Sequence, residues 1–261
     1  MKRTSIDDKG TDSVGLSIVI PVFEESRKVC GDIAAASAFL ADFPDGGEII
    51  IVDDGSHDNT ADIAEQCASQ AAVPVRVIRL ERNRGKGCAV RTGILQSQGY
   101  YVMFADSGCC VPFEEAMTGI KLIQSGRCQI AHGSRKLNVS HIHRPQSFYR
   151  RLCSRLFHWL LIHDLKRLAN LTDTQCGFKV YDGDIARCLY ATSTVDGFMF
   201  DVEIILLAIK YGYPIVEFPV DWSWDPDSRL HPSRVAITVL KDLIWLSREY
   251  KDVLKPYKDA E

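Results

Sequence analysis

Short apolar runs rich in β-branched residues alternate along the chain with segments whose apolar residues recur at helical spacing. A continuous apolar run is typical of a strand buried in a parallel sheet, and the helical spacing is typical of a covering helix. The pattern predicts strands over 16–22, 48–52, 75–80, 100–105, 129–133 and 215–220. It predicts helices over 24–43, 56–67 (with Ser56 as N-cap), 87–98, 113–125, 148–165, 201–211 and 235–250. This alternation indicates an α/β fold with a mostly parallel central sheet flanked by helices.

The chain of 261 residues shows no internal repeat or linker. We therefore expect one domain over 16–250, between a polar leader at 1–15 and a tail at 251–261. A net charge of −3 argues against general nucleic-acid binding, and no apolar run approaches the ~20 residues of a membrane span. The nine cysteines include no CxxC pair. This spacing predicts no zinc site and unpaired thiols in a reducing compartment.

Polar clusters follow three of the predicted strands: 21–25, 53–56 and 106–108. The carboxyl ends of parallel strands meet at one edge of a sheet, so these clusters should lie together. Their carboxylates repel one another unless a cation or a ligand hydroxyl offsets the charge. A nucleoside supplies such hydroxyls, and a divalent metal on a diphosphate supplies the cation. The clusters therefore predict a nucleotide site.

Three segments resemble the motifs of family 2 glycosyltransferases, which have the GT-A (nucleotide-diphospho-sugar transferase) fold. They read SIVIPVFEE over 17–25, IIVDDGS over 50–56 and NRGKG over 83–87. In combination they are most similar to the dolichyl-phosphate glucose and mannose synthases. The resemblance implies that the nucleotide sugar contacts Pro21, Val22, Glu24, Asp53, Asp54, Lys86 and Asp106.

Asp106 stands where the resembling family has a DxD metal motif, which here reads Asp106-Ser107-Gly108. The second aspartate is missing. The resemblance implies Mg²⁺ or Mn²⁺ at Asp106, because such ions often use few protein ligands together with substrate phosphates. The departure lowers the metal affinity that we expect. It also leaves open a sugar-nucleotide-binding module without catalysis.

The acceptor side carries further likenesses to polyprenyl-phosphate sugar synthases. The segments GSRK at 133–136 and RRLCSR at 150–155 resemble regions associated with a lipid phosphate, which implies roles for Ser134, Arg135, Arg150 and Ser154. The segment DTQCGFK at 173–179 resembles the glucosyl members of the family. Asp173 and Asp201 are expected to shape the catalytic site, and Arg229 to neutralise the departing diphosphate. The helix expected at 148–165 has an apolar stripe and a basic side. The stripe alone is more typical of core packing, and the resemblance to lipid-phosphate enzymes favours an interfacial helix.

The sequence thus predicts an inverting glycosyltransferase that moves a hexose, with glucose from UDP-glucose favoured over mannose from GDP-mannose, to a polyprenyl phosphate. We expect it on the cytoplasmic face of a membrane, attached peripherally. One alternative is transfer to a glycan or glycolipid hydroxyl, which would need Asp201 or Asp173 as a general base. An NAD-dependent enzyme is disfavoured, because no GxGxxG follows the first strand.

Overall fold

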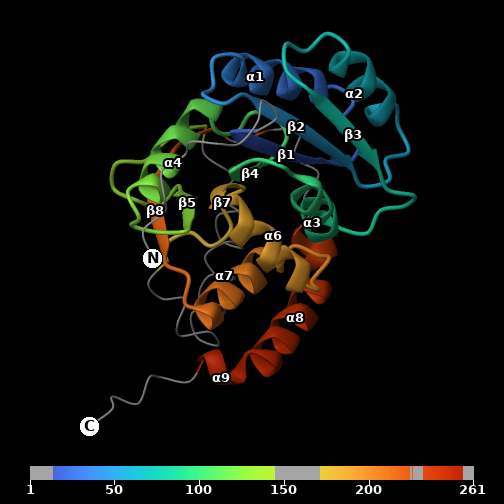
Figure 1. The fold of residues 1–261 in the computed structure, drawn as a ribbon. Helices are drawn as coiled ribbons and strands as arrows, with labels where there is room; N and C mark the ends of the chain where they lie inside the picture. Colours follow the sequence, from blue (N-terminus) through green and yellow to red (C-terminus); the bar gives the residue numbers. More distant parts are fainter. Residues whose placement is uncertain (1–13, 145–170, 224, 226–231, 255–261) are drawn as a thin grey trace.

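The computed structural model describes residues 14–144, 171–223, 225 and 232–254 (Figure 1). Its main strands are β1 (Leu16–Val22), β2 (Gly47–Asp53), β3 (Val75–Arg79), β4 (Tyr101–Ala105), β5 (Ile130–Ser134), β7 (Phe178–Asp182) and β8 (Ile215–Pro219). They form a seven-stranded sheet in the order β3-β2-β1-β4-β7-β5-β8. Only β7 runs antiparallel to its neighbours β4 and β5, so the described sheet is mostly parallel as predicted.

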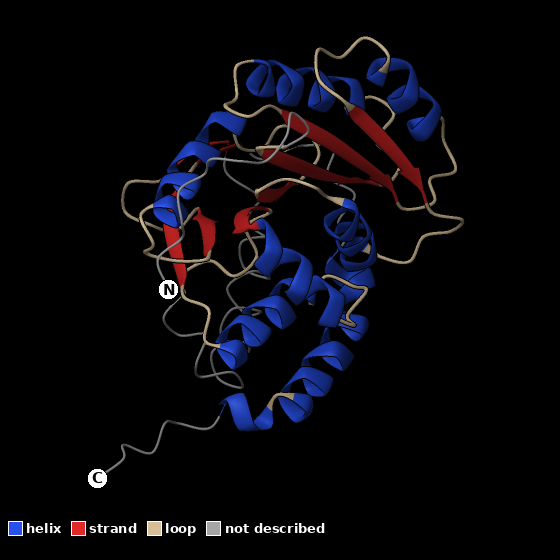
Figure 2. Ribbon diagram, viewed as in Figure 1, coloured by secondary structure: helices blue, strands red, loops and turns tan. Residues whose placement is uncertain are grey.

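Helices cover both faces of this sheet (Figure 2). They are α1 (Val29–Ala41), α2 (Thr60–Ala68), α3 (Lys86–Gln96), the short η1 (Phe113–Glu115) with α4 (Ala116–Gln124), α6 (Gly183–Thr192), α7 (Phe200–Tyr211), α8 (Pro232–Glu249) and α9 (Lys251–Leu254). Successive strand residues point to opposite faces. Ile18 and Ile20 accordingly join the core under α1, α2 and α4, whereas Val19 joins the core under α3, α6, α7 and α8.

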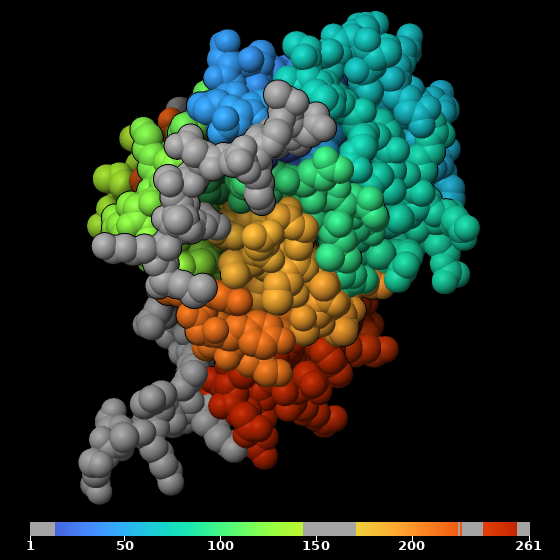
Figure 3. Space-filling model, viewed as in Figure 1, coloured from blue at the N-terminus to red at the C-terminus, as the bar shows by residue number. Residues whose placement is uncertain are grey.

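A small second sheet pairs β6 (His141–Arg144) with β9 (Asp221–Ser223). This pairing joins the segment that follows β5 to the segment that follows β8, although the two are distant in sequence. In the space-filling view, the red surface of α8 lies at the opposite end of the molecule from α1 and α2 (Figure 3). No helix in the described ranges is long and apolar enough to cross a membrane.

The six predicted strands are confirmed to within one residue at each end. Helix α1 begins five residues later than predicted, because Glu24 adopts a left-handed φ of 53° that a helix cannot contain. Helix α2 begins at Thr60 and not after Ser56, whose hydroxyl is used in the turn at the end of β2. Strand β7 and helix α6 were not predicted. The helix predicted over 148–165 lies outside the described residues.

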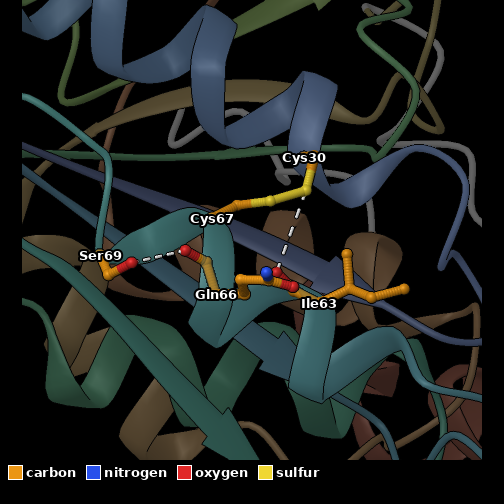
Figure 4. Close-up of a disulfide and its surroundings, with 5 residues drawn as sticks. All are labelled: Cys30, Ile63, Gln66, Cys67 and Ser69. Carbon is orange, nitrogen blue, oxygen red and sulfur yellow. Dashed lines mark hydrogen bonds between the residues drawn. A yellow bond between two sulfur atoms is a disulfide. The ribbon is translucent and has the colours of Figure 1, made fainter.

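A disulfide joins Cys30 at the start of α1 to Cys67 at the end of α2 (Figure 4). The prediction that all the cysteines are unpaired thiols is therefore wrong for this pair. The two helices lie side by side on one face of the sheet, which brings the two Cα atoms to 5.7 Å, within the usual range for a disulfide. The two cysteines are 37 residues apart in the sequence, and this spacing matches no motif that would predict their pairing. Cysteine content consequently no longer indicates a reducing compartment.

Candidate active site

The ends of β1 and β2 lie side by side, with Val22 in register with Asp53. The Asp54 amide donates to the Val22 carbonyl at 2.9 Å. The Asp54 carboxylate in turn accepts the amides of Arg84 and Gly85, each at 2.8 Å. Burial raises the pKa of Asp54, while these two bonds oppose the shift. Asp54 therefore holds the NRGKG turn against the strand ends.

The other residues predicted to bind the nucleoside meet around Ser56. Its amide and hydroxyl both donate to Asp53 Oδ1, and its hydroxyl oxygen accepts the Glu24 amide at 2.8 Å. Pro21 is half-buried and Val22 is buried directly before this turn. The structure thus brings together the predicted donor residues at one edge of the sheet.

Lys86 begins α3, directly after Gly85. Gly85 has a φ of 110°, and a Cβ there would lie 2.5 Å from the Asp196 carbonyl oxygen, so only glycine fits this turn. The Lys86 ammonium lies 2.6 Å from Asp106 Oδ1, over the rings of Phe104 and Phe200. Burial alone would lower the pKa of Lys86, but the carboxylates of Asp106 and Asp201 outweigh it and raise the pKa. Lys86 is therefore a charged ammonium at the site.

Asp106 follows β4, and its side chain remains 39% exposed. Its amide donates to the Gly177 carbonyl at 2.9 Å, and a Cβ on Gly177 would lie 2.0 Å from Asp106 Oδ2. The absence of a side chain at Gly177 therefore makes room for this carboxylate. Asp106 faces a small pocket, whose other lining residues include Cys110, Val111, Cys176, Phe178 and Trp222.

The loop after Asp106 is fixed by Asp32 of α1, a carboxylate that is 1% exposed. Asp32 accepts the Ser107 hydroxyl at 2.6 Å and the amides of Gly108 and Cys109 at 2.8 and 3.0 Å. Burial raises the pKa of Asp32, against the effect of these bonds. The sequence prediction missed Asp32. Its position on the apolar stripe of a helix was the available signal, because a charged residue is rarely buried there without partners.

On the predicted acceptor side, Arg135 makes a two-pronged contact with Asp173, at 2.6 Å through Nε and 2.8 Å through a terminal nitrogen. Burial would raise the pKa of Asp173, but Arg135 outweighs it and holds the pKa well below its usual range. The guanidinium also lies over the Trp222 ring. Ser134 is fully buried, with its hydroxyl 2.7 Å from that of Thr172.

Asp201, at the start of α7, is 3% exposed and accepts a bond from buried Lys179 at 2.8 Å. Burial raises the pKa of Asp201, and the ammonium groups of Lys179 and Lys86 counteract the shift. The structure therefore places Asp201 in the interior, where its charge also acts on Lys86. Arg150, Ser154 and Arg229 lie outside the described residues. Within the described ranges, no three His, Cys, Asp or Glu side chains gather as a complete metal site.

Residues 17–189 match the family model "Glycosyl transferase family 2". The chain belongs to this family. It is 32% identical over 249 residues to a dolichyl-phosphate beta-glucosyltransferase of Dictyostelium discoideum, covering 92% of this chain and 76% of that protein. The proteins of the same name from Homo sapiens and Saccharomyces cerevisiae are 32% and 30% identical, over 90% and 99% of this chain and 75% and 86% of theirs.

Solved structures of GT-A glycosyltransferases share the fold. Glucosyl-3-phosphoglycerate synthase from Mycobacterium tuberculosis, crystallised with Mn²⁺, UDP and glucosyl-3-phosphoglycerate, has a TM-score of 0.64 at 18% identity, covering 90% of this chain and 80% of that one. Mannosyl-3-phosphoglycerate synthase from Rubrobacter xylanophilus has a TM-score of 0.66 at 16% identity, covering 95% and 78%. The chain is thus a GT-A glycosyltransferase, as the sequence motifs predicted.

Proposed function

We propose that this glycosyltransferase transfers glucose from UDP-glucose to the phosphate of dolichol or a related polyprenol. The relatives at 30–32% identity carry the name of that activity. The observation that supports it within the chain is the convergence of the acidic strand ends, the NRGKG turn and the Lys86–Asp106 pair at one sheet edge. This edge offers oxygens for a nucleoside and cations for a diphosphate.

In this proposal Val22, Glu24 and Asp53 contact the nucleoside. Asp54 acts by fixing the turn, since both of its carboxylate oxygens accept backbone amides. The start of α3 and the Lys86 ammonium then face the diphosphate, as expected for an anion at a helix N-terminus.

A divalent cation fits Asp106. The Lys86 ammonium already lies 2.6 Å from Asp106 Oδ1, so this carboxylate accepts a positive charge. Apart from this ion pair, that buried oxygen has no hydrogen-bond partner in the part of the chain that the structure describes. We infer that Asp106 holds Mg²⁺ or Mn²⁺, with the diphosphate oxygens completing the coordination. A bound ion would neutralise charge on the leaving diphosphate.

The charge of the acceptor phosphate determines whether the reaction needs a general base. A lipid monophosphate has a second pKa of about 6, by analogy with phosphoserine, so its oxygen is already anionic near neutral pH. That oxygen forms a bond to the anomeric carbon while the bond from this carbon to the diphosphate breaks, with inversion. No general base is needed. The pairing of Asp173 with Arg135 and of Asp201 with Lys179 favours this acceptor over a hydroxyl.

Cations are still required to orient the acceptor phosphate. Arg135 lies near the Asp106 pocket through its contact with Trp222, which lines that pocket. We keep Arg150 and Ser154 as proposed partners of the acceptor phosphate and Arg229 as a partner of the leaving diphosphate, from the sequence resemblance.

We propose that the protein acts at a membrane surface. Along α8 the apolar side chains of Ile237, Leu240, Ile244 and Trp245 are 70%, 53%, 45% and 40% exposed. Their spacing places them on one side of the helix, as in a helix that lies in the headgroup region. The cytoplasmic side of the membrane stays a prediction.

The test is release of nucleoside diphosphate from UDP-glucose and GDP-mannose, with a short polyprenyl phosphate, with the matching polyprenol, or with neither. Release that needs UDP-glucose and the phosphorylated lipid supports the proposal. Release with the polyprenol would support a hydroxyl acceptor. Tight UDP-glucose binding without release under any condition would support a binding module. Each arm is repeated with Mg²⁺, Mn²⁺ and EDTA to test the metal.

A further inference from the structure

Gly108 stands where the second aspartate of the DxD motif is missing, and another carboxylate lies beside it. Gly108 has a φ of 95°, and a Cβ built on it would lie 3.3 Å from Asp225 Oδ2 and 3.5 Å from Asp225 Cγ. The Asp225 carboxylate therefore borders the space that an aspartate side chain at position 108 would enter. We propose that Asp225 supplies the second carboxylate of the metal site, from the segment that follows β9. The inference rests on the proposed function in requiring a metal-bound nucleotide.

The backbone fixes the two segments to each other. The Ser223 amide, two residues before Asp225, donates to the Cys110 carbonyl at 2.8 Å. Asp32 holds the intervening part of the Asp106 loop through the Gly108 and Cys109 amides. The position of Asp225 over Gly108 thus follows from a hydrogen-bonded frame. An aspartate within the loop and an aspartate from this second segment are two ways to place an oxygen ligand at the same point.

Asp106 and Asp225 also share one neighbour. Burial, followed by the charges of Asp106 and Asp225, raises the pKa of the Cys110 thiol to about 12. Cys110 lines the pocket that Asp106 faces. The two carboxylates therefore flank the same side of the molecule, around one half-buried thiol.

Each of the two carboxylates has an ammonium partner. Lys86 lies 2.6 Å from Asp106, and Lys28 lies 2.5 Å from both Asp225 and Glu25. A divalent cation at Asp225 must compete with Lys28 for the same oxygen, and Lys28 then retains Glu25 as its partner. The Lys28 charge consequently weakens metal binding, whereas the Asp225 charge strengthens it. This opposition distinguishes a metal ligand from an ordinary ion pair.

Two protein carboxylates are a sufficient donor set for this class of site. Mg²⁺ and Mn²⁺ prefer oxygen ligands, and Mg²⁺ in nucleotide enzymes is usually held by one or two carboxylates plus substrate phosphates and water. Removing one of the two carboxylates should therefore weaken metal binding markedly without abolishing nucleotide binding.

The experiment measures Mn²⁺ binding to the full chain by electron paramagnetic resonance of free Mn²⁺, in the presence of saturating UDP. We expect Asp225→Asn to weaken Mn²⁺ binding about tenfold or more, since affinity follows the charge of the ligand set. We expect Lys28→Met to tighten it. Asp221→Asn is the matched control, because this β9 carboxylate pairs with His141 and should leave Mn²⁺ binding unchanged. UDP binding in EDTA should be the same in Asp225→Asn and in the wild type.

Unchanged Mn²⁺ binding in Asp225→Asn would overturn the inference. Equal weakening in Asp225→Asn and Lys28→Met would also overturn it, because loss of a purely structural ion pair predicts that result. Circular dichroism and thermal unfolding verify that each variant is folded. Failure of the proposed function is separate: it would appear as absent glucose transfer to polyprenyl phosphate by the wild type, whatever its Mn²⁺ affinity.

Discussion

Replacing Asp201 by Asn tests whether this carboxylate takes part in the chemistry or in the scaffold. Lys179 and Asp201 are 1% and 3% exposed, with the ammonium 2.8 Å from Asp201 Oδ1. The same ammonium donates to the Cys176 carbonyl at 2.6 Å. Neither charge has water as an alternative partner. Asp201→Asn leaves the buried Lys179 ammonium without the negative charge that pairs with it. Lys179→Met leaves the buried Asp201 carboxylate without the ammonium that pairs with it.

The expected loss is large because a buried charge without its partner keeps its full desolvation cost. Breaking a buried pair by removing one partner costs about 3–5 kcal/mol of unfolding free energy. For a chain of this size, that corresponds to a fall in Tm of roughly 10 °C. The double variant Lys179→Met/Asp201→Asn removes both charges. It should therefore lose clearly less stability than the sum of the two single variants.

The assay is urea unfolding of the wild type, both single variants and the double variant, together with glucose transfer per folded enzyme. The matched control is the Arg79–Asp62 pair, at a similar 2.7 Å but with side chains 44% and 69% exposed. Asp62→Asn should therefore cost far less stability than Asp201→Asn. Additive losses in the cycle would refute the reasoning. A stable Asp201→Asn variant without transfer would instead restore the hydroxyl-acceptor hypothesis, in which Asp201 is the base.

Three other changes test separate parts of the fold. Gly177→Ala places a Cβ 2.0 Å from Asp106 Oδ2 and should reduce nucleoside diphosphate release about a hundredfold per folded enzyme; unchanged release would contradict this. Burial, followed by the charge of Lys179, lowers the pKa of His132 in the folded protein. As the pH falls below about 6.5, His132 therefore becomes protonated in the unfolded chain but stays neutral in the folded one. Between pH 6.5 and 5 this should remove up to roughly 2 kcal/mol of unfolding free energy, a loss absent from His132→Leu in urea titrations. Cys30→Ser/Cys67→Ser should lose roughly 3–4 kcal/mol, and wild type in dithiothreitol should lose as much.

The donor edge was predictable from the sequence, because it depends on local pattern and one general rule. Apolar runs located β1, β2 and β4, and the carboxyl ends of parallel strands share an edge. The residues that follow those runs therefore had to meet. The structure brings Asp53, Asp54 and Asp106 to that edge together with Lys86.

The acceptor half was less predictable, because one of its strands, β7, does not follow the parallel pattern. Strand β7 runs antiparallel and contains Lys179, a charge that conceals the apolar character of a buried strand. The Cys30–Cys67 disulfide and the approach of Asp225 to Gly108 depend on which segments become neighbours in space. No spacing within the chain encodes either one. Sequence motifs located residues there without indicating what each residue contacts.

The carboxylates around the candidate site have two possible uses, and exposure separates them. Asp32, Asp54, Asp173 and Asp201 are each at most 4% exposed, and all accept bonds from loops, an arginine or a lysine. Their oxygens are occupied in holding the site together. The side chains of Asp106 and Asp225 keep 39% and 14% exposure, and each pairs with a flexible ammonium group that an incoming cation can displace. A divalent ion therefore has access to these two carboxylates at a much lower cost than to the other four, which is why the charge of Asp225 should influence metal binding and the charge of Asp32 should influence folding.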